Sequence, residues 1–90
     1  SFKSLYRIRY FDLSNNQLNQ TAQNNILLDL FDNWNAIKRG GVSINLKNQT
    51  NSSGALAFPS EVGYAKARIL VANGWSIGLS GGIPPEPTEV

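Results

Sequence analysis

The 90-residue sequence contains no histidine, no cysteine and no methionine. The lack of cysteine excludes a thiolate nucleophile, a disulfide framework and a Cys/His zinc site, and the lack of histidine excludes an imidazole general base. No apolar run approaches the roughly 20 residues that a membrane-spanning helix needs. The sequence therefore favours a non-enzymatic chain with no cofactor, no metal and no membrane insertion.

Charge is also scarce, since only 16% of the residues are charged and the formal net charge is +2. A balance this small does not favour a nucleic-acid-binding surface. Fifteen Asn and Gln residues make the surface polar mainly through amides. The chain is long enough for one small domain, and it starts at Ser1 rather than Met, which suggests a processed product or a piece of a longer chain.

Three strand-like segments recur at a spacing of 33 residues, at positions 9–13, 42–46 and 75–79. Each alternates apolar with small or polar residues, and the second and third share the pattern Gly-apolar-Ser-Ile-x-Leu. Alternation of this kind is typical of strands. Three copies at one period indicate a repeated supersecondary unit.

Two helical patterns separate the strands, at residues 21–38 and 60–73. We expect Thr21 and Ser60 to cap the helix starts and Gly40-Gly41 to end the first helix. Lys66 and Arg68 are expected to be solvated. The apolar stripe of the first helix comprises Ala22, Ile26, Leu27, Leu30, Phe31, Trp34 and Ile37. The expected buried face of the second comprises Val62, Ala65, Ile69, Leu70 and Ala72.

The order strand, helix, strand, helix, strand predicts an α/β fold of three parallel strands with two right-handed crossover helices. We divide the chain into an entry segment or strand (1–9), a βαβαβ module (10–80) and a Pro-rich tail or linker (81–90). The Asn/Ser-rich stretch 47–59 is predicted to be mobile and to be the least structured segment between the helices and strands. The tail favours an extended polyproline conformation, and we expect it to dock rather than hang free.

The residues around the first strand resemble a leucine-rich repeat. Ile8-x-x-Phe11-x-Leu13-x-x-Asn16-x-Leu18 fits the pattern LxxLxLxxNxL, and the string FDLSNNQL at residues 11–18 looks like the LDLSNNxL strings of bacterial and phage leucine-rich-repeat proteins. The downstream order of helix, G-x-V-x-L-like strand, polar loop, Ala-rich helix and final G-W-x-apolar strand resembles the terminal modules of those proteins. The resemblance covers about residues 8–80 and implies a short solenoid.

The resemblance also implies roles for individual residues. Phe11, Leu13 and Leu18 would point into the core, with Ile8 at the first repeat position. Asn16 would turn inward and hydrogen-bond the backbone of the bend after the strand. Proteins of this family bind partners rather than turn over substrates, and they occur on bacterial surfaces and in phage virions or tails.

The strand alternation predicts one outward row made of Tyr10, Ser43 and Ser76. A second row contains Asp12 and Asn45, with Gly78. We predict that Tyr10, Asp12, Ser43, Asn45 and Ser76 form a partner-binding face for a protein or a glycan. The alternative is an ordinary solvated sheet face.

Two other patterns have competing interpretations. Asp29 and Asp32 share a helix face, but hard cations take six or more oxygen ligands, so we expect a solvated surface rather than a metal site. Basic and aromatic residues alternate near the start of the chain, which is compatible with binding single-stranded nucleic acid or with packing against a neighbouring subunit. These residues are Phe2, Lys3, Tyr6, Arg7, Arg9 and Tyr10.

The favoured hypothesis is a structural or attachment module of a phage virion or a bacterial cell surface, localised in the virion or outside the cell. A small solenoid has open sheet edges, so it would be stabilised by self-assembly or by joining a larger protein body. The alternative hypothesis is a small nucleic-acid-binding protein that uses the basic N-terminal segment.

Overall fold

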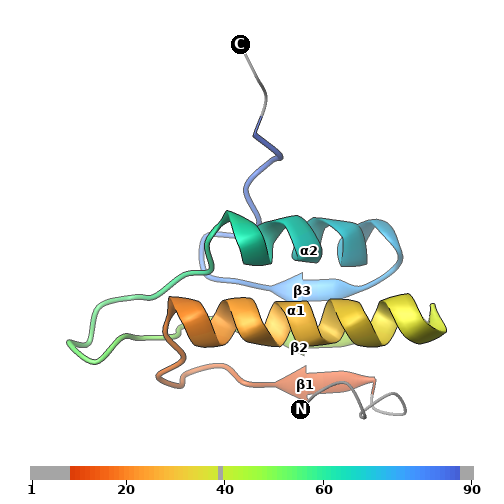
Figure 1. Ribbon diagram of the computed structural model, residues 1–90. Helices are drawn as coiled ribbons and strands as arrows, with labels where there is room; N and C mark the ends of the chain where they lie inside the picture. Colours follow the sequence, from red (N-terminus) through yellow and green to blue (C-terminus); the bar gives the residue numbers. More distant parts are fainter. Residues whose placement is uncertain (1–8, 39, 88–90) are drawn as a thin grey trace.

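A computed structural model of the chain describes residues 9–38 and 40–87. Three parallel strands alternate with two helices, and the sheet order follows the chain order. This confirms the predicted α/β arrangement of three parallel strands and two helices. The elements are β1 (Tyr10–Asp12), α1 (Gln20–Ile37), β2 (Ser43–Asn45), α2 (Glu61–Ala72) and β3 (Ser76–Gly78) (Figure 1).

The strands pair in direct register, and each level of the sheet holds one residue from every strand. Phe11 pairs with Ile44, and Ile44 pairs with Ile77. Phe11 and Ile44 are buried, whereas Ile77 on the outer strand is half-buried. The level before this apolar one contains Tyr10, Ser43 and Ser76. The level after it contains Asp12, Asn45 and Gly78.

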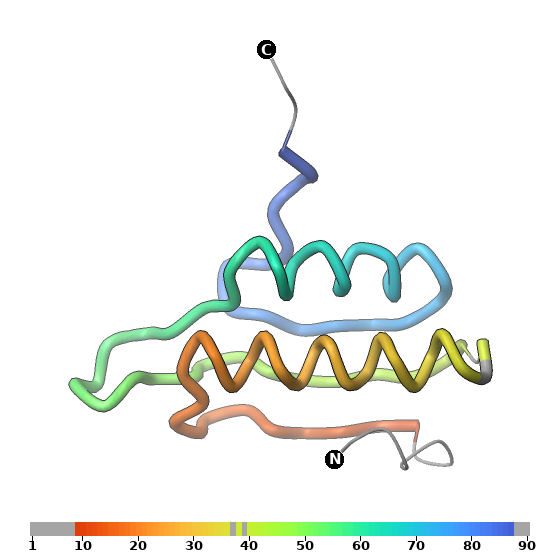
Figure 2. The backbone as a smooth tube through the Cα atoms, in the orientation of Figure 1, coloured from red at the N-terminus to blue at the C-terminus, as the bar shows by residue number. Residues whose placement is uncertain are grey.

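The molecule has one helix layer and one sheet layer, and its principal extents are 37 × 36 × 17 Å. Both helices run alongside the strands (Figures 1 and 2). The inward residues of the sheet share one apolar core with the helices, while the opposite side chains of the strands remain exposed or half-buried. Neither of the two described helices therefore covers the opposite face of the sheet. The buried core comprises Phe11, Leu27, Leu30, Val42, Ile44, Leu46, Ala67, Leu70, Trp75 and Leu79.

Each strand is followed by a residue in the left-handed conformation, which turns the chain toward the helix layer. The φ angles are 58° at Asn15, 61° at Asn48 and 76° at Gly81. Asn and Gly are the residues that adopt this region most readily. The three left-handed residues therefore lie at matching distances after the ends of the three strands.

Helix α2 packs on α1 through its smallest side chains. Gly63, Ala67 and Leu70 are its buried residues. A Cβ atom at Gly63 would collide with the Asn24 side-chain oxygen and press on Leu27, so glycine at this position permits the close approach. Gly63 and Ala67, which carry little hydrophobic signal, are therefore part of the buried face of α2 beside Leu70.

The predicted buried face of α2 is wrong except at Leu70. Val62 is 57% exposed and Ile69 is 38% exposed, Ala72 is exposed, and Ala65 is only half-buried. The reason is the close approach at the glycine, which turns the small-residue side of the helix, rather than its β-branched side, toward α1.

The helix ends also differ from the predicted caps. Asn19 caps α1, because its Oδ1 accepts a hydrogen bond from the Ala22 amide at 2.9 Å, so Thr21 lies inside the helix. The helix ends at Lys38, whose φ of 52° is left-handed, before Gly40. Ser60 occupies the predicted cap position of α2, but its hydroxyl instead accepts from the Asn24 amide at 2.8 Å.

Two buried glutamines join the loops at one end of the sheet. Gln23 is 1% exposed, and its amide nitrogen donates to the carbonyls of Leu18 (2.8 Å) and Ala57 (2.9 Å). Gln49 is 0% exposed; its oxygen accepts from the Leu18 amide at 3.2 Å and its nitrogen donates to the Leu13 carbonyl. The segment after β1 is therefore bound to the segment after β2 by side-chain amides.

The prediction that residues 47–59 are the least structured part is wrong. The segment folds back as a short hairpin in which Thr50 and Leu56 form an antiparallel bridge. The Asn51 amide donates to the Ala55 carbonyl at 2.8 Å, and the Ala57 amide donates to the Gln49 carbonyl at 2.9 Å. The polar composition did not indicate this order, because the hairpin is held by backbone hydrogen bonds, by the Asn51 side chain and by the buried Gln49 amide.

We predict that Gln49→Ala lowers the free energy of unfolding by about 1–3 kcal/mol, because the Leu13 carbonyl and the Leu18 amide would each lose a partner. Urea unfolding followed by circular dichroism measures the change. Gln17→Ala is the matched control, since Gln17 is exposed. Equal stability of the two variants would contradict the role given to Gln49.

Candidate functional site

The five residues predicted to bind a partner lie on the uncovered face of the sheet. Tyr10 is 59% exposed, Asp12 and Ser76 are exposed, and Ser43 and Asn45 are half-buried. The register places them in two neighbouring rows, and adjacent strands in a sheet lie about 4.8 Å apart. The structure therefore brings these residues together on one small polar surface, which we call the outer face.

Two residues of the outer face also shape the ends of their strands. Asp12 Oδ1 accepts from the Ser14 amide at 3.0 Å, and Asn45 Oδ1 accepts from the Lys47 amide at 3.0 Å. Such short-range side-chain-to-backbone bonds are typical of Asp and Asn at turns. One oxygen of each side chain is therefore already hydrogen-bonded to a backbone amide.

Asp12 is the carboxylate of the outer face. The Ser14 hydroxyl donates to its Oδ1 at 2.6 Å. This hydrogen bond, together with the one from the Ser14 amide, lowers the pKa of Asp12 below its ordinary value. The outer face therefore carries a negative charge at its β1 end at neutral pH.

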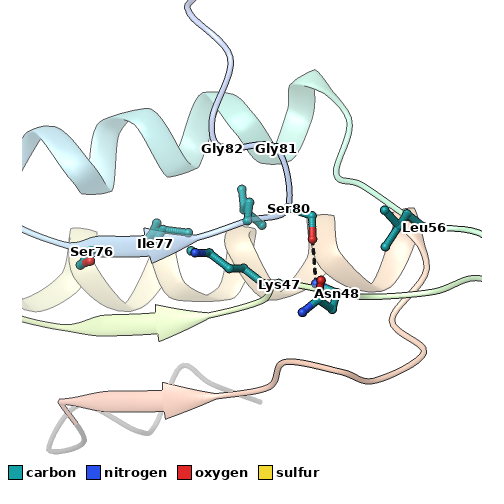
Figure 3. Close-up of a pocket in the computed structure, with 10 residues that line it drawn as sticks. Lys47, Asn48, Leu56, Ser76, Ile77, Ser80, Gly81 and Gly82 are labelled. Atoms are coloured by element: carbon teal, nitrogen blue, oxygen red, sulfur yellow. Dashed lines mark hydrogen bonds between the residues drawn. The ribbon is translucent and has the colours of Figure 1, made fainter.

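An open hollow of about 640 Å³ runs along β3, at the outer edge of the sheet. Figure 3 shows Ser76, Ile77 and Lys47 beside it, with Ser80 and Asn48 farther along. The Asn48 amide donates to the Ser80 hydroxyl at 2.7 Å, which holds the hollow's end in place. The remaining lining residues are Leu56, Gly78, Leu79, Gly81 and Gly82.

Lys47 brings a positive charge to this hollow. Its side chain lies against Gly78, because a Cβ atom at that position would be only 3.3 Å from the Lys47 Cε. Glycine therefore leaves room for the lysine stem on the outer face. The outer face has a carboxylate on β1 and an ammonium group beside β3.

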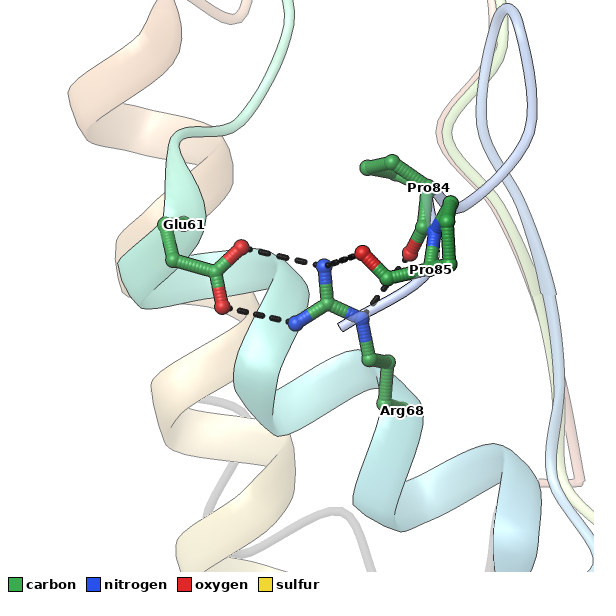
Figure 4. Close-up of polar contacts among 4 residues, drawn as sticks. All are labelled: Glu61, Arg68, Pro84 and Pro85. Carbon is green, nitrogen blue, oxygen red and sulfur yellow. Dashed lines mark hydrogen bonds and ion pairs between the residues drawn. The ribbon is translucent and has the colours of Figure 1, made fainter. Parts of the chain in front are cut away.

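A second polar cluster holds the Pro-rich tail against α2. Arg68 forms a two-point ion pair with Glu61, at 2.6 and 3.0 Å (Figure 4). The same guanidinium donates to the carbonyls of Pro84 (2.9 Å) and Pro85 (3.1 Å). Ile83 is half-buried and packs against the core. Residues 83–85 of the tail are therefore docked on helix α2 of the same chain.

The predicted solvation of Arg68 is consequently wrong. A guanidinium has five N–H donors, and proline carbonyls in an extended segment have no ladder partner, so the two groups complement each other. Lys66 also makes a contact, because its ammonium lies 4.2 Å from the ring centroid of Phe31.

The structural repeat positions are only partly as predicted. Phe11 is buried, and Leu13 and Leu18 are half-buried against the core. Asn16 does bond the backbone of the bend, donating to the carbonyls of Leu13 (2.9 Å) and Ser14 (3.2 Å), but its side chain is exposed rather than turned inward.

The inward role predicted for Asn16 is taken by Gln49. The longer Gln49 side chain reaches the Leu13 carbonyl from the buried side, while Asn16 reaches it from the solvent side. The spacing contained a usable signal, because Gln49 follows Asn16 by one 33-residue period.

Part of the sequence-based site lies outside the described residues. This applies to Ile8 and to the basic and aromatic residues Phe2, Lys3, Tyr6 and Arg7. Arg9 is described, and its guanidinium donates to the Gly40 carbonyl at 2.9 Å. Within residues 9–38 and 40–87 there is no cluster of three His, Cys, Asp or Glu side chains that could hold a metal ion, and no helix long and apolar enough to cross a membrane.

Comparison with known proteins gives no relative. No protein-family model, curated protein or solved structure matches the chain. Function must therefore be argued from the outer face, the hollow along β3 and the docked tail.

We predict that Arg68→Ala releases the tail from α2, because its guanidinium makes the two hydrogen bonds that hold the Pro84 and Pro85 carbonyls. Heteronuclear NOE values for Glu86 would fall toward those of an unstructured chain, with α2 still folded. Lys66→Ala is the control on the same helix. An unchanged NOE at Glu86 in Arg68→Ala would show that Ile83 alone fixes the tail.

The docking of the tail on α2 should also depend on pH. The hydrogen bond from Arg68 lowers the pKa of Glu61 below its ordinary value of 4.5, and the Coulombic attraction acts in the same direction. A lowered folded-state pKa means that the interaction is fully present above pH 4.5 and is lost as the pH falls through the folded value.

We therefore expect the Glu86 NOE to be constant near neutral pH and to fall only below pH 4.5. Glu61→Gln should remove most of this acid-dependent step. A step that persists in Glu61→Gln would assign the titration to another carboxylate.

Proposed function

We propose that the chain is a short leucine-rich-repeat-like solenoid with a 33-residue structural unit. The direct register of Tyr10, Ser43 and Ser76 supports this proposal, because the aligned positions of the sequence are neighbours in the sheet. The left-handed residues after the strands support it as well, because Asn15, Asn48 and Gly81 are also separated by one period.

The solenoid serves as a non-enzymatic protein-interaction module, and the partner binds the outer face. The observation that carries this proposal is the position of Tyr10, which is 59% exposed on the face of the sheet opposite the two described helices. Tyrosine is enriched at protein interfaces because it combines a large apolar ring with a hydrogen-bonding hydroxyl. The small polar neighbours Ser43 and Ser76 leave its ring accessible to a flat partner.

The setting that fits the motif resemblance is a phage virion or a bacterial surface, where the module would mediate assembly or attachment. A glycan is the other ligand compatible with an aromatic ring among hydroxyl and amide groups. The nucleic-acid hypothesis depends mainly on Lys3 and Arg7, and the described Arg9 already bonds the Gly40 carbonyl.

Site-specific photo-crosslinking tests the proposed face. A benzophenone amino acid replaces Tyr10 in one variant and Asn25 in the other, and both are exposed on different layers of the molecule. In native material, the Tyr10 position should label a defined protein and the Asn25 position should not. Nucleic acid as the product, or equal labelling from both positions, would contradict the proposal.

Tyr10→Ala gives the matching affinity measurement with the protein thus identified. We expect binding to weaken roughly tenfold or more, as for an aromatic anchor at the centre of an interface. Gln17→Ala, at an exposed position outside the outer face, is the control. An affinity unchanged by Tyr10→Ala would move the contact away from the outer face.

A further inference from the structure

We propose that the partner at the β3 edge is β1 of a second copy, which pairs head-to-tail with β3 in parallel register. This inference rests on the proposed interaction function and names one occupant of the surface. It concerns the edge of the sheet, whereas the preceding tests concern its outer face.

Backbone polarity at the two sheet edges is complementary. The amide of Ser76 donates to the Val42 carbonyl, and the carbonyl of Gly78 accepts from Leu46, so these residues face β2. Alternation along a strand then directs the N–H and C=O of Ile77 away from β2. Among the described strands, β3 has a neighbour on one side only.

The same reasoning applies to β1. The Arg9 carbonyl accepts from Ser43, and the Leu13 amide donates to Asn45, so the odd-numbered residues of β1 face β2. The N–H and C=O groups of Tyr10 and Asp12 therefore face the opposite edge. In the register already used twice within the chain, Ile77 would donate to Tyr10 and accept from Asp12 of the second copy.

Side chains match in this register as well. Phe11 of the second copy would extend the inward level of Phe11, Ile44 and Ile77, and would cover Ile77, which is half-buried in the single chain. Leu56, at 53% exposure, lines the same hollow. Strand addition would thus remove apolar surface from water at the β3 end of the inward level.

Charge favours this occupant over a generic strand. Asp12 of the second copy would stand next to Gly78, against which Lys47 lies. Asp12 is the only acidic residue of the three strands, and Lys47 is the lysine that lines the hollow. The two would form an ion pair across the contact on the outer face.

The helix layer is compatible with this contact. The tail segment 83–85 follows β3 and is held on α2 by Arg68, in the position that a third helix of a longer solenoid would take. Figure 1 shows this segment leaving beyond α2 while β3 remains at the end of the sheet. Each added copy presents a new β3 edge, so association is open-ended unless the rotation between copies closes a ring.

The absence of natural cysteine allows a disulfide test in the purified chain. Ser76→Cys and Tyr10→Cys are prepared separately, mixed and oxidised. Directly paired residues on neighbouring strands lie about 4.8 Å apart, within the Cα separation that a disulfide spans. The mixture should give a cross-linked dimer containing one chain of each variant.

The matched control mixes Ser43→Cys with Tyr10→Cys, because Ser43 lies on the central strand and has described neighbours on both sides. Little dimer is expected from this mixture. A product formed mainly between two Ser76→Cys chains would overturn the inference in favour of antiparallel β3–β3 pairing. A chain that stays monomeric at millimolar concentration would overturn it outright.

Two further variants examine the contact by sedimentation. Ile77→Pro removes an N–H that faces outward, so it should abolish self-association while circular dichroism stays native. Asp12→Asn keeps the turn-forming oxygen, as Asn45 does on β2, but removes the charge. It should weaken the association constant roughly two- to fivefold, as for an exposed ion pair.

Native self-association in both variants would contradict the proposed contact. Failure of this inference is distinguishable from failure of the proposed function. If the chain is monomeric and Tyr10 still cross-links to another protein, only the head-to-tail contact is lost. If copies associate through β3 and Tyr10 labels nothing else, assembly is the function that remains.

Discussion

Parallel pairing in direct register is the constraint on which the rest of the molecule depends. Because Tyr10, Ser43 and Ser76 are neighbours, every second side chain of the sheet points to the helices and every other one to the uncovered face. The same register aligns the three left-handed bends and leaves the outward backbone groups of β1 and β3 at opposite edges. The core, the outer face and the open hollow are therefore three consequences of one arrangement. A shift by one residue would exchange the buried and exposed sides of a strand.

Side-chain amides maintain this arrangement where the strands end. Each strand is only three residues long, so the ladder itself is short. Gln23 and Gln49 bind backbone groups of the adjoining segments from within, and Asn24 binds Ser60 between the helices. A small domain with few charged residues thus gains specificity from the hydrogen-bonded amides of Gln23 and Gln49, because leaving a buried polar group unpaired is costly.

Much of the fold could be predicted because it depends on periodicity. The alternation at 9–13, 42–46 and 75–79 identified the strands and the outward rows, and the i, i+3, i+4 pattern identified both helices. Apart from the caps of the helices, the errors come from contacts between segments distant in sequence. The face of α2 depends on how closely Gly63 approaches α1, and the order of residues 47–59 depends on where Gln49 is buried. Arg68 could not be assigned because its partners include tail carbonyls that no side-chain pattern specifies.

Amide hydrogen exchange on a dilute sample tests the register most directly. The account predicts slow exchange at Leu13, Ser43, Leu46 and Ser76, whose amides donate across the sheet. It predicts fast exchange at Ile77, whose amide faces the open edge. Ser76 and Ile77 are neighbours in β3, so the exchange rates of these two adjacent amides should differ. Protection at Ile77 with fast exchange at Ser76 would mean that β3 is turned over or shifted by one residue. That result would contradict the arrangement from which the outer face and the open edge were derived.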